Sequence, residues 1–164
     1  MFSIQLPKGI IFGNGSRTKL PEIIQDYGNT VLVITGKKSL KKYNFEKGFE
    51  KLLKDKTAVF RKCDSDEPTI QSVNNIIETA KQFSPDFIIG IGGGTVLDTA
   101  KAVSGLIYQE TDVKDYLEGI GAGLKIMQKG LPWIAVPTTS GTGAEVTKNA
   151  VIKTSERNDK PGFK

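Results

Sequence analysis

Short apolar runs alternate along the chain with longer stretches in which apolar side chains recur at helical spacing. Runs of the first kind predict buried strands, and stretches of the second kind predict helices with one buried face. The predicted strands are 30–35, 57–60, 87–91 and 131–136, with 57–60 nearest an edge of the sheet. The predicted helices are 20–27, 45–54, 70–83 and a fourth that runs from the glycines at 92–94 through Leu106. This alternation is typical of an α/β fold, a Rossmann-like parallel sheet flanked by helices.

One further apolar run, 150–152, precedes a polar stretch rich in turn-forming residues, 155–162. An apolar run that leads into such a turn predicts the start of a β-hairpin. The rest of the chain shows no internal repeat, low-complexity segment or linker.

The chain has 164 residues, of which 38% are hydrophobic and 25% are charged. These values predict one domain, residues 1–164, with a full hydrophobic core. We expect a cytoplasmic protein without membrane contact, because no apolar run could span a bilayer and the first residues do not resemble an export signal.

Cys63 is the one cysteine, so no internal disulfide forms, and its thiol is expected to be semi-buried at a strand end. The sequence contains no histidine, which removes the commonest general base and transition-metal ligand.

The formal charge of +5 raises the question of a nucleic-acid partner. The lysines between 37 and 56 are interspersed with Glu46, Glu50 and Asp55, which is typical of a solvated face rather than a basic stripe. We therefore expect no nucleic-acid partner, and the phosphates of a nucleotide suffice as an anionic ligand.

A glycine cluster, Gly92-Gly93-Gly94, lies where the predicted strand 87–91 passes into the fourth helix. Such a junction points unpaired backbone N–H groups and the positive end of the helix at one spot, and glycine lets a phosphate approach closely. The spacing matches neither the G-x-G-x-x-G fingerprint, because Thr95 stands at the third glycine, nor a P-loop. Helix–strand packing alone is the alternative use of these glycines, but phosphate binding explains their conformational cost better.

Three polar residues follow the glycines, and two of them, Asp98 and Lys101, have two interpretations each. Thr95 is placed to cap the helix, with Asp98 as its capping-box partner. Alternatively, Asp98 turns away from a bound phosphate and accepts a hydrogen bond from a nicotinamide amide. Lys101 is either a cation on the phosphate side or a solvated helix charge.

A second loop, 137–147, directly follows the predicted strand 131–136 and is dense in hydroxyls and glycines. Open α/β sheets bind their ligands beyond the carboxyl ends of the strands. Two such loops facing one crevice would make a site the size of a dinucleotide, although either loop alone could be an ordinary turn.

These two loops closely resemble those of the iron-containing alcohol dehydrogenase family, which shares its fold with glycerol dehydrogenase and dehydroquinate synthase. The matching segments are 92–101 and 137–147, and the sequences at 6–15 and 66–69 also resemble those of the family. The departures are small: Ala144 replaces a common serine, and Thr95 replaces serine but keeps its hydroxyl.

The resemblance implies a set of cofactor-binding residues. The pyrophosphate would be held by Gly93, Gly94 and Thr95. The adenosine and phosphate portions would be contacted by Thr138, Thr139 and Thr142. The nicotinamide end would lie by Asp98, and further contacts are expected from Asn149 and Lys160.

The resemblance also implies parts that this chain does not hold. Members are about twice this length, and their iron or zinc is bound by an aspartate and histidines in a helical C-terminal domain. We therefore expect residues 1–164 to be the nucleotide-binding domain, with no catalytic or metal-binding residue of its own and no activity alone. With the other domain, hydride would pass between NAD(P)H and a small alcohol or aldehyde. A glycerol dehydrogenase or dehydroquinate synthase type of enzyme and a stand-alone nucleotide-binding module remain alternatives, and a homodimer is compatible with the sequence.

The end of the first predicted strand bears on the choice of cofactor. Enzymes that use NAD often carry an acidic residue there, which bonds the ribose 2′-hydroxyl and repels a 2′-phosphate. Here the strand is followed by Gly36, Lys37 and Lys38. Because cations attract a 2′-phosphate, the sequence favours NADP over NAD, unless the lysines only form a solvated turn.

Overall fold

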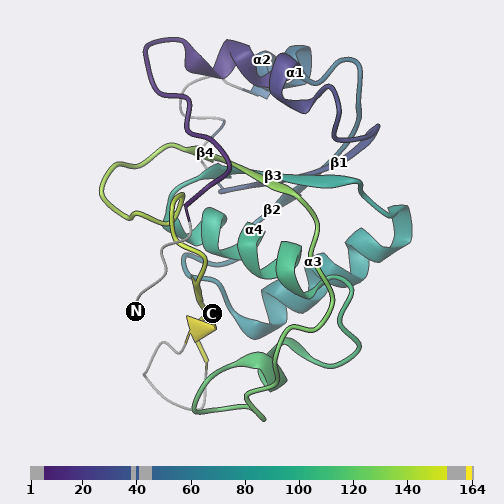
Figure 1. Ribbon diagram of the computed structural model, residues 1–164, viewed down its shortest axis with the longest axis vertical. Coiled ribbons are helices and arrows are strands. Elements are labelled where there is room, and N and C mark those ends of the chain that lie inside the picture. The colour runs from purple at the N-terminus through teal and green to yellow at the C-terminus, as the bar shows by residue number, and fades with distance from the viewer. Residues whose placement is uncertain (1–5, 38–39, 41–45, 155–161, 164) are drawn as a thin grey trace.

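The computed structural model describes residues 6–37, 40, 46–154 and 162–163. Its main sheet has parallel strands in the order β2-β1-β3-β4, with α1 and α2 on one face and α3 and α4 on the other (Figure 1). The strands are β1 Thr30–Thr35, β2 Thr57–Lys62, β3 Phe87–Gly92 and β4 Trp133–Pro137. The helices are α1 Leu20–Ile24, α2 Glu46–Leu52, α3 Ile70–Phe83 and α4 Gly94–Leu106, with 3-10 turns η1 Ser16–Lys19 and η3 Val113–Tyr116. The predicted α/β fold is confirmed, including the edge position of β2.

The central strands β1 and β3 are buried on both faces, as their continuous apolar sequences predict. Every residue of β3 is buried, as is every residue of β1 after Thr30. Successive side chains of a strand point to opposite faces. The face toward α3 and α4 therefore receives Leu32, Ile34 and Ile88. The face toward α1 and α2 receives Val31, Val33, Phe87, Ile89 and Ile91.

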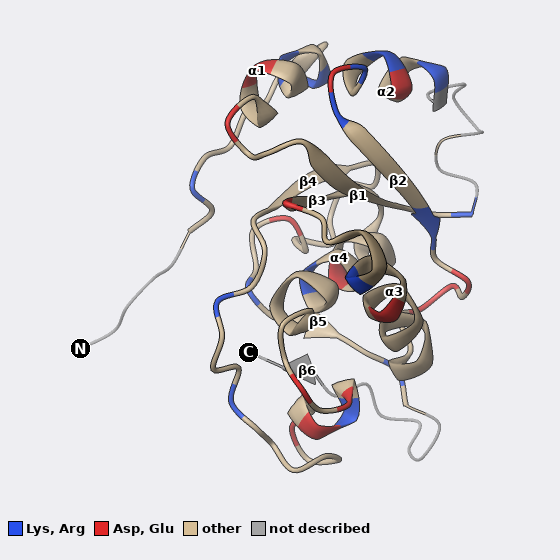
Figure 2. Ribbon diagram, turned by 90° about the vertical axis from the view of Figure 1, so that its right-hand side faces the viewer, with Lys and Arg blue, Asp and Glu red and all other residues tan. Residues whose placement is uncertain are grey.

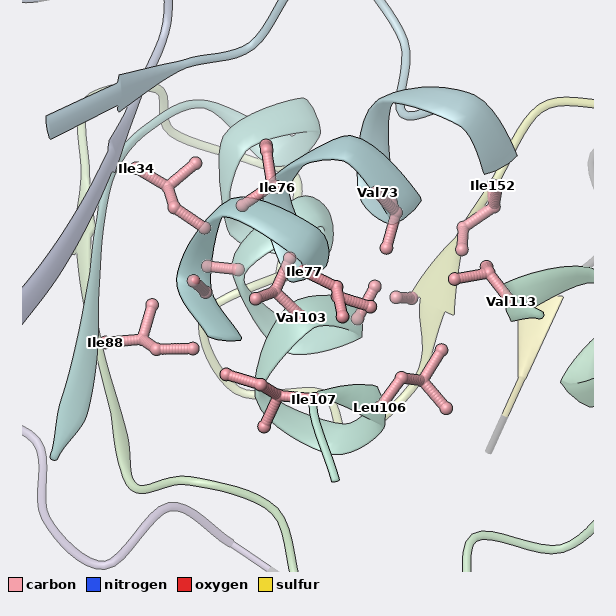
Figure 3. Packing of buried hydrophobic residues seen from close by; sticks show 14 of the residues in the cluster. Ile34, Val73, Ile76, Ile77, Ile88, Val103, Leu106, Ile107, Val113 and Ile152 are labelled. Atoms are coloured by element: carbon pink, nitrogen blue, oxygen red, sulfur yellow. The ribbon is translucent and has the colours of Figure 1, made fainter. Parts of the chain in front are cut away.

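The larger core lies between the sheet and the pair α3 and α4. Figure 3 shows Ile34 and Ile88 projecting from the strands toward α3 and the end of α4. On the far side of the same cluster, Val113 and Ile152 close around Val73 (Figure 3). Each fully buried aliphatic side chain of this kind contributes about 1.5–3 kcal/mol, so α4 is held firmly from two sides.

Helix α3 shows how local sequence sets the element boundaries. Thr69 is its N-cap: the Thr69 hydroxyl accepts a hydrogen bond from the Ser72 N–H at 3.1 Å, and the Ser72 hydroxyl accepts one from the Thr69 N–H at 3.0 Å. This reciprocal pair is a capping box. The helix ends at Ser84, whose φ of 47° is left-handed, so the predicted helix 70–83 is confirmed at both ends.

Two strand boundaries differ from prediction by two residues. β2 continues to Lys62 because its backbone stays in register with β1, where Thr35 pairs with Lys62, even though the side chains there are charged. β4 begins only at Trp133, because the Leu131 N–H donates to the Ser104 carbonyl of α4 at 3.0 Å instead of to a neighbouring strand.

At the amino ends of the strands, the Asp86 side chain links the residue before β3 to the start of β1. Its Oδ2 accepts hydrogen bonds from the N–H groups of Asn29 and Thr30, both at 2.8 Å. These bonds lower the pKa of the Asp86 carboxyl, and the bond from Thr30 has the larger effect. Gly28 lies against the same carboxylate with φ of 100°, and a Cβ there would be 2.4 Å from the Asp86 Cγ, so the chain needs glycine at the turn that leads into β1.

The predicted hairpin is confirmed. β5 Ala150–Val151 pairs in antiparallel fashion with β6 Gly162–Phe163. Next to it, the Lys153 N–H donates to the Pro68 carbonyl at 2.7 Å. This bond ties the segment after β5 to the turn that precedes α3.

Charged side chains lie mainly on the helices and loops. Figure 2 shows lysine and glutamate mixed on α2 and long uncharged stretches along the strands. In the described part of the chain, no helix is long and apolar enough to cross a membrane.

Candidate functional site

The strand order brings three strand ends together. Thr35 pairs with Ile91, and Gly92 pairs with Pro137, so β1, β3 and β4 finish level with one another at one edge. The chain leaves β1 toward β2 on one side, whereas β3 and β4 extend the sheet on the other. In open α/β sheets, ligands bind in the crevice at such a reversal of strand order. The candidate site is therefore the carboxyl edge around the end of β3.

The glycine turn after β3 is shaped by close packing. A Cβ on Gly92 would lie 2.4 Å from Val96 Cγ2, and one on Gly90 would lie 2.9 Å from Ala100 Cβ. Larger residues at these two positions would push α4 away from the strand. These two glycines serve packing, which leaves Gly93 and Gly94 as the candidates for ligand contact.

The predicted cap at Thr95 is wrong. Helix α4 begins at Gly94, its N-cap is Gly93, and no described side chain caps it. Thr95 lies inside the first turn, where its hydroxyl donates to the Asp66 carbonyl at 2.7 Å. The first N–H groups of a helix have no intrahelical acceptor, so the start of α4 offers donors to an anion.

The second loop lies directly against this turn. A Cβ on Gly93 would be 3.0 Å from the Thr139 hydroxyl oxygen, and one on Gly94 would be 3.3 Å from Thr142 Cγ2. The Thr138 N–H donates to the Gly92 carbonyl at 2.9 Å, which extends the β3–β4 pairing into both loops. The structure thus brings Gly93, Gly94, Thr139 and Thr142 into one surface, and both threonines are exposed, as is Thr138.

Asp98 and Lys101 form an ion pair one helical turn further along α4. The Lys101 Nζ lies 3.0 Å from Asp98 Oδ1, and their side chains are 4% and 15% exposed. Asp98 Oδ2 accepts a hydrogen bond from the Val151 N–H at 3.2 Å. The capping-box interpretation of Asp98 is therefore wrong. The interpretation of Lys101 as a solvated helix charge is also wrong, because its side chain is 4% exposed and its ammonium is paired. A direct phosphate contact by Lys101 is not favoured either, because its N–H donors are taken by protein acceptors.

The Lys101 ammonium also binds the far end of the second loop. It donates to the Thr147 hydroxyl at 3.0 Å and to the Asn149 carbonyl at 2.5 Å. Asn149 is exposed beside this contact. The ion pair therefore joins α4 to the segment that carries Asn149 and leads into β5.

The remaining predicted residues lie elsewhere at the edge. Gly36 is half-buried and Lys37 exposed at the end of β1, next to the β3 turn in the sheet order. Lys38 and Lys160 lie outside the described residues.

Two residues of this region were not singled out by the sequence. The Asp66 carbonyl anchors Thr95, and Glu145 carries a buried Oε2 that has no hydrogen-bond partner within the described part of the structure. Neither follows from local sequence, because both depend on how distant segments pack. The opposite charges of Asp98 and Lys101, three residues apart on a helix, were the one available signal for their ion pair.

Cys63 is buried beneath α4, more deeply than predicted. Its thiol donates a weak hydrogen bond to the Thr99 hydroxyl at 3.7 Å. Burial is the main cause that raises the pKa of the Cys63 thiol, so this thiol is suited to packing rather than to nucleophilic attack.

Among residues 6–37, 40, 46–154 and 162–163, no three His, Cys, Asp or Glu residues are grouped closely enough to hold a metal ion. The described residues therefore do not fit an iron or zinc site.

Comparisons with known proteins identify relatives of the whole chain. The family model described as iron-containing alcohol dehydrogenase matches residues 7–164. The NADH-dependent butanol dehydrogenase A of Clostridium acetobutylicum is 29% identical over 163 residues, which cover 98% of this chain and 41% of that protein. The sulfoacetaldehyde reductase of Bilophila wadsworthia is 41% identical over 96 residues, 58% of this chain and 24% of that protein.

Solved structures show the same fold. The NADH-dependent butanol dehydrogenase A of Thermotoga maritima superposes with a TM-score of 0.89 at 32% identity, over 99% of this chain and 41% of that one. The sulfoacetaldehyde reductase of Bifidobacterium kashiwanohense, solved in complex with NAD⁺, superposes with a TM-score of 0.86 at 24% identity, over 99% and 43%. The chain thus spans about two fifths of the length of these relatives.

Proposed function

Because the chain belongs to the iron-containing alcohol dehydrogenase family, we propose that it binds a nicotinamide dinucleotide at the carboxyl edge of its sheet. The observation that carries this proposal is the contact between the two turns, where Gly93 meets Thr139 and Gly94 meets Thr142. A glycine turn alone could serve packing, but a helix start without a side-chain cap beside a row of exposed hydroxyls is suited to a pyrophosphate.

Different groups of the chain contact different parts of the cofactor. The backbone N–H groups at the start of α4 donate to the pyrophosphate, while Gly93 and Gly94 let it approach and Thr95 is fixed by its bond to Asp66. The hydroxyls of the second loop contact the phosphates and adenosine; these are Thr138, Thr139 and Thr142. Asp98 lies by the nicotinamide end, with Asn149 and Lys160 as further contacts.

Asp98 does not oppose an anion at the helix start. A free carboxylate there would repel a phosphate. The Asp98 charge is instead paired with Lys101, and its second oxygen is occupied by the Val151 N–H. The pairing supports a site in which the phosphate and the carboxylate coexist one turn apart.

We further propose that the chain favours NADP over NAD. Gly36 and then Lys37 follow β1, and the exposed Lys37 ammonium can attract a 2′-phosphate. The butanol dehydrogenases among the relatives are named NADH-dependent. The proposed preference for NADP therefore rests on Gly36 and Lys37 of this chain and not on those relatives.

For the whole enzyme we propose hydride transfer between NAD(P)H and a small alcohol or aldehyde. Residues 1–164 position the cofactor, and the iron or zinc and its ligands belong to a further, C-terminal domain that corresponds to the rest of the relatives' length. No step of that chemistry is assigned to the described residues, because they do not fit a metal. The family match favours this reaction over that of dehydroquinate synthase, and a stand-alone nucleotide-binding module is the remaining alternative.

A fluorescence titration of the purified chain with NADPH and NADH tests the proposal. Saturable binding of both, tighter for NADPH, is expected, together with no aldehyde reduction when a divalent metal is added. Absence of binding to both would refute the nucleotide site. Robust metal-dependent turnover by residues 1–164 would refute the division between domains.

A further inference from the structure

Lys101 places a charged ammonium group in the protein interior. Among the described residues it is the one Asp, Glu, Lys or Arg in the buried class, at 5% exposure. An ammonium group is unfavourable in the interior unless it is paired and fully hydrogen-bonded. An apolar side chain would fill the same position on α4 without that cost, so packing alone does not account for a lysine there.

All three of its N–H donors have an acceptor. They are the Asp98 carboxylate at 3.0 Å, the Thr147 hydroxyl at 3.0 Å and the Asn149 carbonyl at 2.5 Å. An ammonium group has three donors, so its geometry is fully specified. The group fixes the carboxylate of Asp98 relative to the backbone of Asn149, which no bond within α4 alone could do.

These contacts lie beyond the glycine turn. Asp98 follows Gly94 by about 6 Å along the helix axis, and Thr147 and Asn149 are at the opposite end of the second loop from Thr138 and Thr139. The contacts assigned to the adenosine and pyrophosphate thus lie at one end of the site. Among the groups that Lys101 holds, Asp98 is the one assigned to the nicotinamide end, and the same ammonium binds the Asn149 carbonyl.

From this arrangement we infer that Lys101 is a positioning residue for the nicotinamide half of the cofactor. It acts through Asp98, whose carboxylate it anchors to the Asn149 backbone, and it touches neither the pyrophosphate nor the adenosine. This inference rests on the proposed function, and it predicts a selective effect: loss of the ammonium weakens binding of the intact dinucleotide and spares a ligand that lacks nicotinamide.

The test is isothermal titration calorimetry of the chain with NADPH and with 2′-phospho-ADP-ribose, which lacks the nicotinamide. For Lys101→Met we expect the Kd for NADPH to rise about tenfold or more, as for loss of a charge-assisted contact. The Kd for 2′-phospho-ADP-ribose should rise no more than about twofold, because the Asp98 carboxylate, unpaired in this variant, repels the pyrophosphate only weakly from one helical turn away. A merely structural role would weaken both ligands together, and that result, or no change for either ligand, would overturn the inference.

Lys153→Met is the matched control. Lys153 pairs on the surface with Glu67 at 3.2 Å and is 53% exposed, so this variant loses the same charge without touching the Lys101 contacts. Both ligands should bind it as they bind the original chain, and a loss of NADPH binding equal to that of Lys101→Met would attribute the effect to net charge and overturn the inference.

Thr147→Val covers the case in which Lys101→Met does not fold. It removes one acceptor of the ammonium at an exposed position, and a weaker loss confined to NADPH is expected. Unchanged NADPH affinity would then count against Lys101. If the unaltered chain bound neither ligand, the proposed function itself would fail, whereas normal binding without a selective loss would overturn the positioning role alone.

Discussion

Gly93 and Thr139, far apart in the sequence, meet at the carboxyl edge of the sheet, where a Cβ on Gly93 would stand 3.0 Å from the Thr139 hydroxyl oxygen. The contact makes the turn before α4 and the loop after β4 parts of one surface. It also means that a side chain at residue 93 would displace Thr139 or fill the space that a phosphate needs.

Gly93→Ala should therefore weaken dinucleotide binding. Its φ of −82° allows alanine, so the fold should tolerate the change, and we expect the Kd for NADPH to rise at least about tenfold with little change in Tm. NADPH fluorescence and a thermal melt measure the two quantities. The matched control is Gly48→Ala in α2, where a Cβ meets nothing within 4 Å. That variant should stabilise the helix by about 0.5–1 kcal/mol and bind NADPH normally, and an equal loss of binding in both variants would contradict the account.

Lys37→Glu should reverse the cofactor preference. A carboxylate at the end of β1 repels a 2′-phosphate and can accept hydrogen bonds from the ribose hydroxyls of NAD. We expect the ratio of NADPH to NADH affinity to fall about fivefold to tenfold. Lys47→Glu, a charge reversal on the exposed side of α2, should leave the ratio unchanged. Equal effects of the two variants would show that net charge, and not the strand end, controls the preference.

Asp86 should make the fold sensitive to acid. The N–H groups of Thr30 and Asn29 lower the pKa of its carboxyl, so its contribution to stability is present above the unfolded-state pKa of about 3.9 and is lost as the pH falls through the lower, folded-state pKa. Urea midpoints measured between pH 7 and pH 2 should fall less steeply in Asp86→Asn than in the original chain. Asp26→Asn, an exposed carboxylate elsewhere, should keep the original profile. Parallel profiles for the original chain and Asp86→Asn would remove Asp86 from the explanation.

The Cys63 thiol should be protected in the folded protein. Burial raises its pKa, and the thiolate is the reactive form. Iodoacetamide at pH 8 should label it very slowly in buffer and readily in denaturing urea, as followed by mass spectrometry. Since Cys63 is the one cysteine, each labelled molecule reports on this site. Rapid labelling of the native protein would contradict the buried position under α4.

The fold could be predicted from the sequence because the patterns that specify its strands and helices lie within short segments. The unbroken apolar runs of β1 and β3 specify strands buried on both faces, and the apolar stripe from Ile70 to Phe83 specifies α3. The role of Thr95 was not readable, because the carbonyl of Asp66, brought in by the turn after β2, takes its hydroxyl. The buried position of Lys101 was not predicted for the same reason: two of its acceptors, Thr147 and Asn149, come from a segment distant in the sequence.

The most direct measurement is a crystal structure of the chain grown with NADPH. The account predicts the pyrophosphate at the backbone N–H groups that open α4, within hydrogen-bond reach of the Thr139 hydroxyl, and the nicotinamide on the side of Asp98. It would be contradicted if the nucleotide were bound at another surface, or if the space between Gly93 and the second loop were filled by the protein's own side chains with no nucleotide between them.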